Sequence, residues 1–344
     1  MVLSGVLEEI KILDIIIPAY NCKDTLPRAL GSIVAQTKKE KCIVTVVDDC
    51  STEDLKPIID NFKNYIKINY IKLKENLKYP GLVRQIGLNN TIAPFVMFLD
   101  SDDMLEPTAV ELVNNEMLKT DREVIIGYFF RQDEKGNLAI MKENNTTWLH
   151  GNVYRRSFLK KYNIQFPAGY NEDGSFNTQC YMLSDKLGIL NRPIMYWLHN
   201  ENSITRSGKD FSARCADDLV STLKFAYENI FKQGGRNEKV IKNMGTHWAL
   251  FFKMANILID RDGEEYRDIE KKFEEELKNF ENTILINDFT PEEKIYFKQG
   301  YIKGLLKYCN GDKPFYYEPE NFLINYGINI TLNVSDLIFR GENQ

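Results

Sequence analysis

Apolar and polar residues alternate in blocks along the first 130 residues. Residues 12–18 and 42–47 are nearly continuous β-branched runs, the pattern of strands that are buried on both faces. Apolar residues at helical spacing follow each run. Further strands are expected at 66–73, 96–99 and 124–130, and helices at 24–36, 51–62, 82–92 and from Pro107 onward. This alternation predicts right-handed crossovers and therefore an α/β fold, with a mostly parallel central sheet and helices on both faces.

Three of these helices carry recognisable start residues. Asp24 is expected to cap the first helix, and Ser51 with Asp54 three residues on resembles a capping box for the second. Pro107 suits the first turn of the helix after the fourth strand, where its missing N–H costs nothing. We therefore place these helix starts at Asp24, Ser51 and Pro107.

Polar turns follow three of the expected strands. They are Pro18-Ala19-Tyr20-Asn21, Asp48-Asp49 and Asp100-Ser101-Asp102-Asp103. Ligands of open α/β sheets bind outside the carboxyl ends of the strands. The three turns are therefore expected to meet in one crevice, although they are far apart in the sequence.

The turn after the fourth strand holds three carboxylates in four positions. Such a cluster repels itself at the mouth of a core unless a cation or hydrogen-bond donors compensate it. Oxygen ligands without an adjacent His or Cys suit Mg²⁺ or Mn²⁺ rather than Zn²⁺. A solvated turn or a helix cap is the alternative, because Asp and Ser also favour those positions.

The regular alternation of strand-like and helix-like segments ends after Arg131. Residues 148–156 and 171–176 mix polar and aromatic side chains, and the chain becomes helical and charge-rich after Ser212. A length of 344 residues favours two domains. We expect a first domain at 1–210 and a mainly helical second domain at 211–344.

Composition narrows the class of protein. The hydrophobic content of 43% is enough for a packed core, and a net charge of −5 gives no nucleic-acid signal. Six scattered cysteines without a C-x-x-C pair, and only three histidines, indicate reduced thiols and no structural zinc. No secretory signal or membrane span is evident, so we expect a cytoplasmic protein, with peripheral attachment to the inner face of the membrane left open.

The order and spacing of several motifs resemble those of GT-A-fold glycosyltransferases, within the inverting family 2. The resemblance covers roughly residues 12–207. Its parts are Pro18-Ala19-Tyr20-Asn21, Val47-Asp48-Asp49-Cys50-Ser51, Gly81-Leu82-Val83-Arg84-Gln85-Ile86-Gly87-Leu88, Asp100-Ser101-Asp102, His150-Gly151-Asn152-Val153-Tyr154, Glu172-Asp173 and the segment 196–205. Val83-Arg84-Gln85 departs from the family's Ala-Arg-Asn, and the Q-x-x-R-W motif of processive synthases is absent.

The resemblance implies a donor site in the first 130 residues and an acceptor side at 131–210. Asp102 would bind Mn²⁺ or Mg²⁺ directly, with Asp100 facing the ribose and the metal's waters. His199 would supply a further metal or phosphate contact, and Arg206 would lie in a loop over the diphosphate. The expected donor-binding residues are Pro18, Ala19, Tyr20, Asn21, Asp48, Asp49, Arg84, Asp100, Ser101 and Arg206.

Simpler interpretations exist for several of these residues. Tyr20 could be an ordinary core residue, Asp48 a cap for the turn at Ser51, and Asp103 a cap for the next helix. Arg84 could form a plain surface ion pair, and His199 could be structural. These alternatives stay open at the level of sequence.

Inverting transfer needs a base opposite the leaving group. By the resemblance this base is Asp173, with Glu172 orienting the acceptor or the loop. A capping pair for a helix at 174–182 is the alternative, because acids are favoured near helix N-termini.

The implied function is non-processive transfer of a sugar from a nucleotide-diphosphate sugar, with UDP favoured, to a hydroxyl acceptor. A non-catalytic carbohydrate-binding or scaffold protein and a sugar-nucleotide pyrophosphorylase are the alternatives. The acceptor is expected to be a glycan or glycopolymer; a lipid-linked or capsular saccharide, a protein side chain and modified phage DNA also stay open. The helical domain would bind acceptor or form a homo-oligomer.

Overall fold

The computed structural model describes residues 11–142, 148–201, 203, 215–259 and 288–308, with short helical pieces between 267 and 279. The chain divides into two compact units, Met1–Ser207 and Gly208–Gln344. The boundary expected at 210/211 falls within 204–214, outside the described residues.

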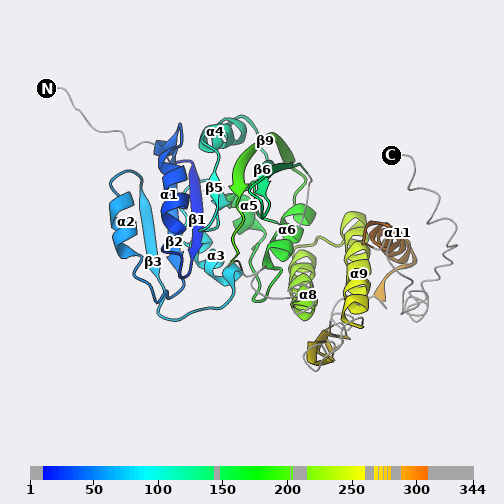
Figure 1. Ribbon diagram of the computed structural model, residues 1–344. Coiled ribbons are helices and arrows are strands. Elements are labelled where there is room, and N and C mark those ends of the chain that lie inside the picture. Colours follow the sequence, from blue (N-terminus) through cyan, green and yellow to red (C-terminus); the bar gives the residue numbers. More distant parts are fainter. Residues whose placement is uncertain are drawn as a thin grey trace. The chain divides into compact units, whose positions relative to one another are not determined.

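A nine-stranded sheet forms the centre of the first unit (Figure 1). Its order is β3-β2-β1-β4-β8-β6-β9-β5, and β7 pairs with β6. Parallel pairing joins β3, β2, β1 and β4, and also β6 with β9, whereas β8, β5 and β7 pair antiparallel with their neighbours. The strands are β1 Leu13–Ala19, β2 Cys42–Asp48, β3 Ile68–Lys72, β4 Phe95–Phe98, β5 Met104–Leu105, β6 Val124–Gln132, β7 Leu138–Met141, β8 Asn152–Arg155 and β9 Leu187–Trp197.

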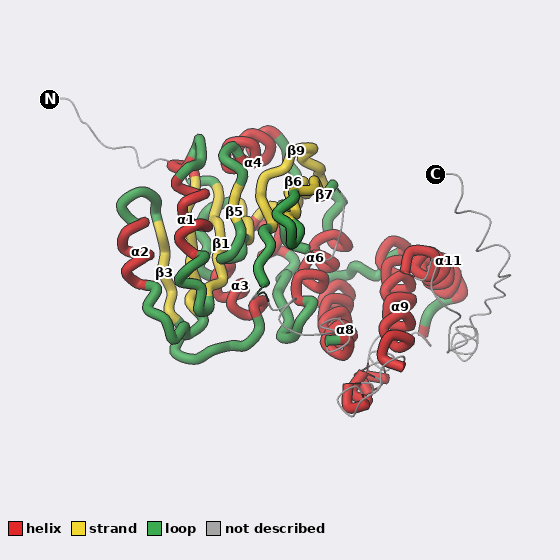
Figure 2. The backbone as a smooth tube through the Cα atoms, in the orientation of Figure 1, coloured by secondary structure: helices red, strands yellow, loops and turns green. Residues whose placement is uncertain are grey.

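Helices cover both faces of this sheet, which confirms the predicted α/β class (Figure 2). Alternate residues of β1 point to opposite faces. Ile15 and Ile17 belong to a core cluster that includes residues of α1, α2 and α4. Ile16 faces α3 instead, so closely that a Cβ on Gly87 would lie 2.4 Å from its Cγ2. The helices are α1 Leu26–Val34, α2 Lys56–Phe62, α3 Pro80–Asn89, α4 Ala109–Lys119, α5 Arg156–Lys161 and α6 Glu172–Leu183, with a short η1 at Lys39–Lys41.

The predicted helix starts were wrong by two to five residues. The helix α1 begins at Leu26 without a side-chain cap, α2 begins at Lys56, and Pro107 precedes the start of α4 at Ala109. Ser51 does not cap α2, because its hydroxyl accepts a hydrogen bond from the Asn21 backbone at 3.0 Å. The side chain that resembles a helix cap in sequence is used to join two strand ends.

The second unit is helical in its described part, as predicted. Its longer helices are α8 Ala216–Lys232, α9 Glu238–Ile259 and α11 Pro291–Tyr308. Glycines let α9 and α11 pack backbone to backbone: a Cβ on Gly300 would lie within 2 Å of the Lys242 carbonyl oxygen. Among the described helices, none is both long and apolar enough to cross a membrane.

Candidate active site

Hydrogen bonds join the turns at the carboxyl ends of β1 and β2. The Asp49 backbone N–H donates to the Ala19 carbonyl at 2.8 Å, and the Asn21 side-chain oxygen accepts from the Thr52 backbone N–H at 2.9 Å. Asn21 and Cys50 both have left-handed φ angles, +45° and +59°, which turn the chain sharply here. The first two polar turns therefore form one structure, as the strand-end argument predicted.

Asp48 holds this structure together from inside and is not accessible to a ligand. Its side chain is fully buried; one oxygen accepts from the Ser51 backbone N–H at 2.8 Å and the other from the Tyr70 hydroxyl at 2.6 Å. Asp48 was expected to bind the donor; its contacts within the protein are those of the alternative role, a cap for the turn at Ser51. Both carboxylate oxygens are already used within the protein.

Tyr20 and Asp49 lie beside this turn with different exposure. The Tyr20 side chain is about half exposed, at 51%, so it is not the ordinary core residue that the sequence allowed. Asp49 is nearly buried, and one of its oxygens accepts from the Leu77 backbone N–H at 2.8 Å. Burial raises the pKa of Asp49 above its usual value. An accessible aromatic ring thus stands near a fixed carboxylate.

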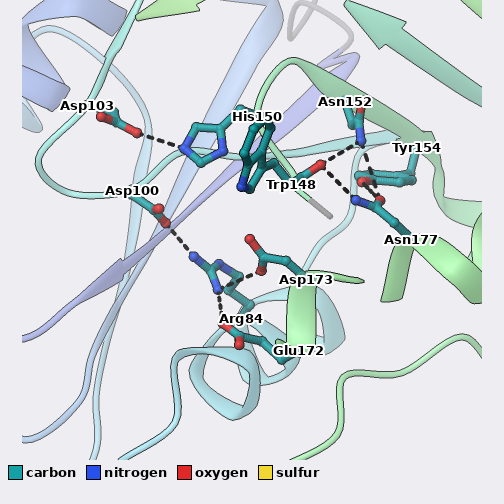
Figure 3. A network of polar contacts seen from close by, with 10 residues as sticks. All are labelled: Arg84, Asp100, Asp103, Trp148, His150, Asn152, Tyr154, Glu172, Asp173 and Asn177. Carbon is teal, nitrogen blue, oxygen red and sulfur yellow. Dashed lines mark hydrogen bonds and ion pairs between the residues drawn. The ribbon is translucent and has the colours of Figure 1, made fainter. Parts of the chain in front are cut away.

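Arg84 is the centre of the acidic cluster (Figure 3). Its Nη2 donates to Asp100 at 2.6 Å, and its Nη1 donates to Glu172 at 2.8 Å and to Asp173 at 3.1 Å. The arginine is 5% exposed, so it does not form the surface ion pair that the sequence allowed. One guanidinium from α3 thus connects the turn after β4 to the start of α6.

Burial and Arg84 act in opposite directions on the three carboxylates. Burial raises the pKa of Glu172 to about 7, with repulsion from Asp173 adding to the effect and Arg84 only partly offsetting it. The pKa of Asp173 is also raised, chiefly by burial. Burial would raise the pKa of Asp100 too, but the charge of Arg84 outweighs it and lowers that pKa. Two acids of the cluster therefore bind protons more readily than free carboxyls do.

The helix α6 begins at Glu172, two residues before the start predicted at Gly174. Both acids therefore lie in its first turn, where negative charge is favoured. Their side chains nevertheless pair with Arg84 in α3, and a Cβ on Gly81 would lie 2.6 Å from the Cγ of Glu172. This close helix contact fixes the acids relative to Arg84, so they are not merely a capping pair.

The turn after β4 points its acids in different directions. Asp102 is partly exposed, and its carboxylate accepts from the Asn200 side-chain amide at 2.7 Å. The guanidinium of Arg28 donates to the Asp102 carbonyl. Asp103 is buried and accepts from the Leu198 backbone N–H at 2.9 Å, so it does not cap α4. Within the described residues, Asp102 is the one acid of this turn whose carboxylate is partly exposed and has no Arg or His partner.

Asp103 also pairs with His150, which the sequence placed only in an acceptor-side segment. The His150 Nε2 lies 3.3 Å from the Asp103 carboxylate. Burial raises the pKa of Asp103 to about 6. Burial would lower the pKa of His150, but the carboxylates of Asp103 and Asp100 outweigh it and raise that pKa. A ligand atom from each of Asp100, Asp103 and His150 lies within 4.8 Å of the other two, a group that could hold a metal ion.

The other residues expected at the site lie as follows. Burial raises the pKa of the Cys22 thiol, and the Ser101 side chain partly offsets this effect. The His199 backbone N–H donates to the Gln132 side chain at 3.2 Å, and its imidazole acts electrostatically on Asp133. Arg206 lies outside the described residues.

A divalent cation fits the chemistry of this turn. Carboxylate oxygens of one short loop are hard ligands, and an imidazole is close by, which suits Mn²⁺ or Mg²⁺. Asp103 is enclosed and already bonded to the protein, whereas Asp102 is accessible to a ligand. An ion that also touches a bound diphosphate would therefore reach Asp102 first.

Sequence reasoning missed three contacts at the site. Arg28 lies 74 residues before Asp102 and has no local signal. Asn200 belongs to the segment 196–205, but in that part of the segment only its neighbour His199 was predicted to contact the metal or a phosphate. The pairing of His150 with Asp103 connects segments 47 residues apart, which no spacing in the sequence marks.

Comparison with known proteins identifies the first unit. The model of glycosyl transferase family 2 matches residues 14–172. The chain is 27% identical over 219 residues to the glycosyltransferase GlyA of Streptococcus pneumoniae, a match that covers 56% of this chain and 31% of GlyA, so the chain spans about a third of that relative's length. It is 23% identical over 296 residues to the poly(ribitol-phosphate) β-N-acetylglucosaminyltransferase TarP of Staphylococcus aureus, covering 80% of this chain and 88% of TarP.

The fold is also that of a solved structure. Residues 1–349 of S. aureus TarS in complex with UDP superpose with a TM-score of 0.62 at 18% identity, covering 89% of this chain and 93% of that one. This likeness supports the GT-A fold, with a helical region after the sheet domain. The family model identifies residues 14–172 of the chain as a glycosyltransferase domain of family 2.

Proposed function

We propose that the protein is an inverting, metal-dependent, non-processive glycosyltransferase that moves a sugar from a UDP-sugar to a hydroxyl of a glycan or glycopolymer. One observation carries the proposal: Arg84 pairs with both Asp100 in the acidic turn and Asp173 at the start of α6. A donor-phosphate site and a general base are thereby held next to each other.

The donor would occupy the carboxyl ends of β1, β2 and β4. The exposed ring of Tyr20 can stack on a nucleobase, and the free oxygen of Asp49 can accept a hydrogen bond from it. Asp102 would hold Mn²⁺ or Mg²⁺, with Asp100 beside it and His199 on the adjoining segment. When bound, the ion supplies Lewis-acid neutralisation of the departing diphosphate's charge.

Asp173 is proposed as the base. Its carboxylate takes the proton of the acceptor hydroxyl while that oxygen bonds to the anomeric carbon, and the bond from this carbon to the diphosphate oxygen breaks. Burial raises the pKa of Asp173, which makes its carboxylate a stronger proton acceptor. Arg84 keeps a positive charge beside it, and Glu172, held by the same arginine, orients this group rather than touching the sugar.

The nature of the acceptor is proposed from the relatives. TarP is named for transfer of N-acetylglucosamine to poly(ribitol-phosphate), and TarS is described with UDP. We therefore expect UDP-N-acetylglucosamine or a similar UDP-sugar as donor, and a polyol-phosphate or saccharide polymer as acceptor. Attack from the face opposite the leaving group turns an α-linked donor into a β-linked product.

The direct test is a thermal-shift screen of UDP-, GDP-, CDP- and dTDP-sugars with and without Mn²⁺. A ligand that binds only the folded state raises the melting temperature by mass action. The proposal predicts a shift with a UDP-sugar that needs the metal, and none with the other nucleotides. A metal-independent shift, or an equal shift with GDP-sugars, would contradict it.

A further inference from the structure

Two residues of one segment touch both halves of the candidate active site. The Trp148 carbonyl accepts a hydrogen bond at 2.7 Å from the side-chain amide of Asn177 in α6, the helix whose first turn carries Asp173. The imidazole of His150 lies 3.3 Å from Asp103, which directly follows Asp102 in the acidic turn. In Figure 3 the His150 ring stands between the acidic turn and the start of α6.

Aromatic rings hold the His150 side chain in place. Its ring centroid lies 4.8 Å from that of Trp197 and 5.4 Å from that of Phe129, tilted by 31° and 35°. The His150 side chain is only 9% exposed. Asp103 is equally constrained, because its other carboxylate oxygen accepts from the Leu198 backbone. Neither partner of the pair is free to turn toward solvent.

The backbone of the same segment is fixed as well. Gly151 has a φ of +75°, and a Cβ there would lie 2.5 Å from the Gly127 carbonyl oxygen. The Gly127 backbone N–H donates to the Gly151 carbonyl at 2.8 Å. A glycine is therefore required where the segment passes β6. The contact between Gly151 and Gly127 fixes the backbone next to His150, and so the position of the imidazole beside Asp103.

The enclosed position of the pair argues against its serving as the donor's metal site. Asp103 is 1% exposed, whereas a residue that holds an ion beside a bound diphosphate would need a carboxylate that solvent can reach. The partly exposed Asp102 meets that condition. The imidazole of His150 fills the role of a local partner for Asp103 instead.

We propose that Asp103 and His150 form a positioning pair, which ties the turn carrying Asp102 to a segment anchored on α6, the helix that carries Asp173, and so sets the distance between the donor's diphosphate and the base. This proposal rests on the proposed function. His150 and Asp103 touch neither donor nor acceptor, and they act through Asp102 and Asp173. Their role is to hold Asp102 and Asp173 at a fixed distance from each other.

The test compares His150→Phe and Asp103→Asn with the wild-type protein, in the presence of Mn²⁺ and UDP-N-acetylglucosamine. His150→Phe keeps an aromatic ring in the stack, and Asp103→Asn keeps the shape of the side chain. Each variant is expected to lower kcat for transfer by about 10- to 100-fold, as loss of such supporting contacts typically does. The donor KM and the affinity for UDP with Mn²⁺ are expected to stay unchanged.

A control separates positioning from general loss of stability. Tyr227→Phe removes a buried hydroxyl that lies 2.8 Å from His247 Nδ1 in the second unit. This variant breaks a comparable buried polar contact within the second unit, so it is expected to lower the melting temperature without changing kcat. If Tyr227→Phe lowers kcat as much as His150→Phe does, the effect is one of stability and the proposal is wrong.

A double-mutant cycle asks whether His150 acts through the base. In an Asp173→Asn background, His150→Phe is expected to cause no further loss of the residual transfer rate, because the group that it positions is already gone. Independent, multiplying losses would overturn the proposal, as would wild-type kcat in both His150→Phe and Asp103→Asn. If the wild-type protein itself neither binds nor turns over a UDP-sugar, the proposed function fails, and that result is distinct from either variant outcome.

Discussion

The Nη1 atom of Arg84 lies 3.1 Å from the Oδ1 atom of Asp173, in a contact that is almost closed to solvent. An arginine stays protonated at any pH at which the protein folds. The carboxylate proposed as the base therefore has a permanent cation beside it. That cation also contacts Asp100 and Glu172, so its removal would leave three acids facing one another.

Replacing Arg84 by methionine should be severely destabilising. Removing one partner of a buried ion pair typically costs about 3–5 kcal/mol, because the remaining charges stay buried and unpaired. Urea denaturation of the Arg84→Met variant measures this loss of unfolding free energy. Lys56→Met is the control, since it breaks the exposed pair between Lys56 and Asp60, and its effect should be small. Equal losses in the two variants would show that the Arg84 cluster is not a tight network.

Glu172 should make stability depend on pH. Its pKa is about 7 in the folded protein against 4.5 for a free glutamate, so between these values the folded state binds the proton more strongly than the unfolded state does. The stability of the wild-type protein should therefore fall, relative to Glu172→Gln, as the pH rises from about 4.5 to about 7. Urea denaturation of both proteins across this range is the measurement. Parallel stability curves would mean that Glu172 is ionised normally.

Gly151 and Gly31 should respond oppositely to alanine. At Gly151 the left-handed φ alone costs a residue with a Cβ about 1–2 kcal/mol, before the clash with Gly127 is counted. At Gly31, within α1, a Cβ meets nothing within 4 Å, and the substitution should stabilise by about 0.5–1 kcal/mol. The melting temperatures of Gly151→Ala and Gly31→Ala, measured by thermal unfolding, check the two expected effects. A stable Gly151→Ala variant would mean that the segment before β8 can shift.

Asp102→Asn should remove the metal dependence of donor turnover. The amide keeps the size of the side chain and its place near Asn200, but it loses the negative charge that a divalent ion needs. Titration of Mn²⁺ against the rate of UDP release is the measurement, and the expected result is a low, metal-independent rate. An unchanged metal optimum would assign the ion to other ligands, with Asp100, Asp103 and His150 as the alternative group.

Much of the fold follows from the pattern of the sequence. The continuous apolar runs of β1, β2 and β4 and the helical spacing of α1 predicted the parallel half of the sheet, because strands covered on both faces must be apolar throughout. The gathering of polar turns at the strand ends followed from the same topology. These features depend on the local spacing of apolar residues, which can be read from a single sequence.

The contacts that were missed depend on tertiary structure. Asp48, Ser51 and Asp103 are suitable types for a ligand site or a helix cap, but each also has a partner that only the folded chain brings close: the Tyr70 hydroxyl for Asp48, and the backbone N–H groups of Asn21 and Leu198 for the other two. Arg84 was predicted to be a donor-binding residue, whereas its three simultaneous carboxylate partners were not predicted. Which of several adjacent acids stays accessible is decided by neighbouring strands and cannot be deduced from spacing.

The most direct measurement of the central claim is transfer by Asp173→Asn, compared with its binding of UDP-N-acetylglucosamine and Mn²⁺. The proposed donor site lies on the turns after β1, β2 and β4, whereas Asp173 belongs to α6, so the variant should bind the donor as the wild-type protein does. Without a carboxylate to accept the hydroxyl proton, its transfer rate should fall by about 100-fold or more. Near-normal transfer by Asp173→Asn would contradict this account and assign the base to another residue.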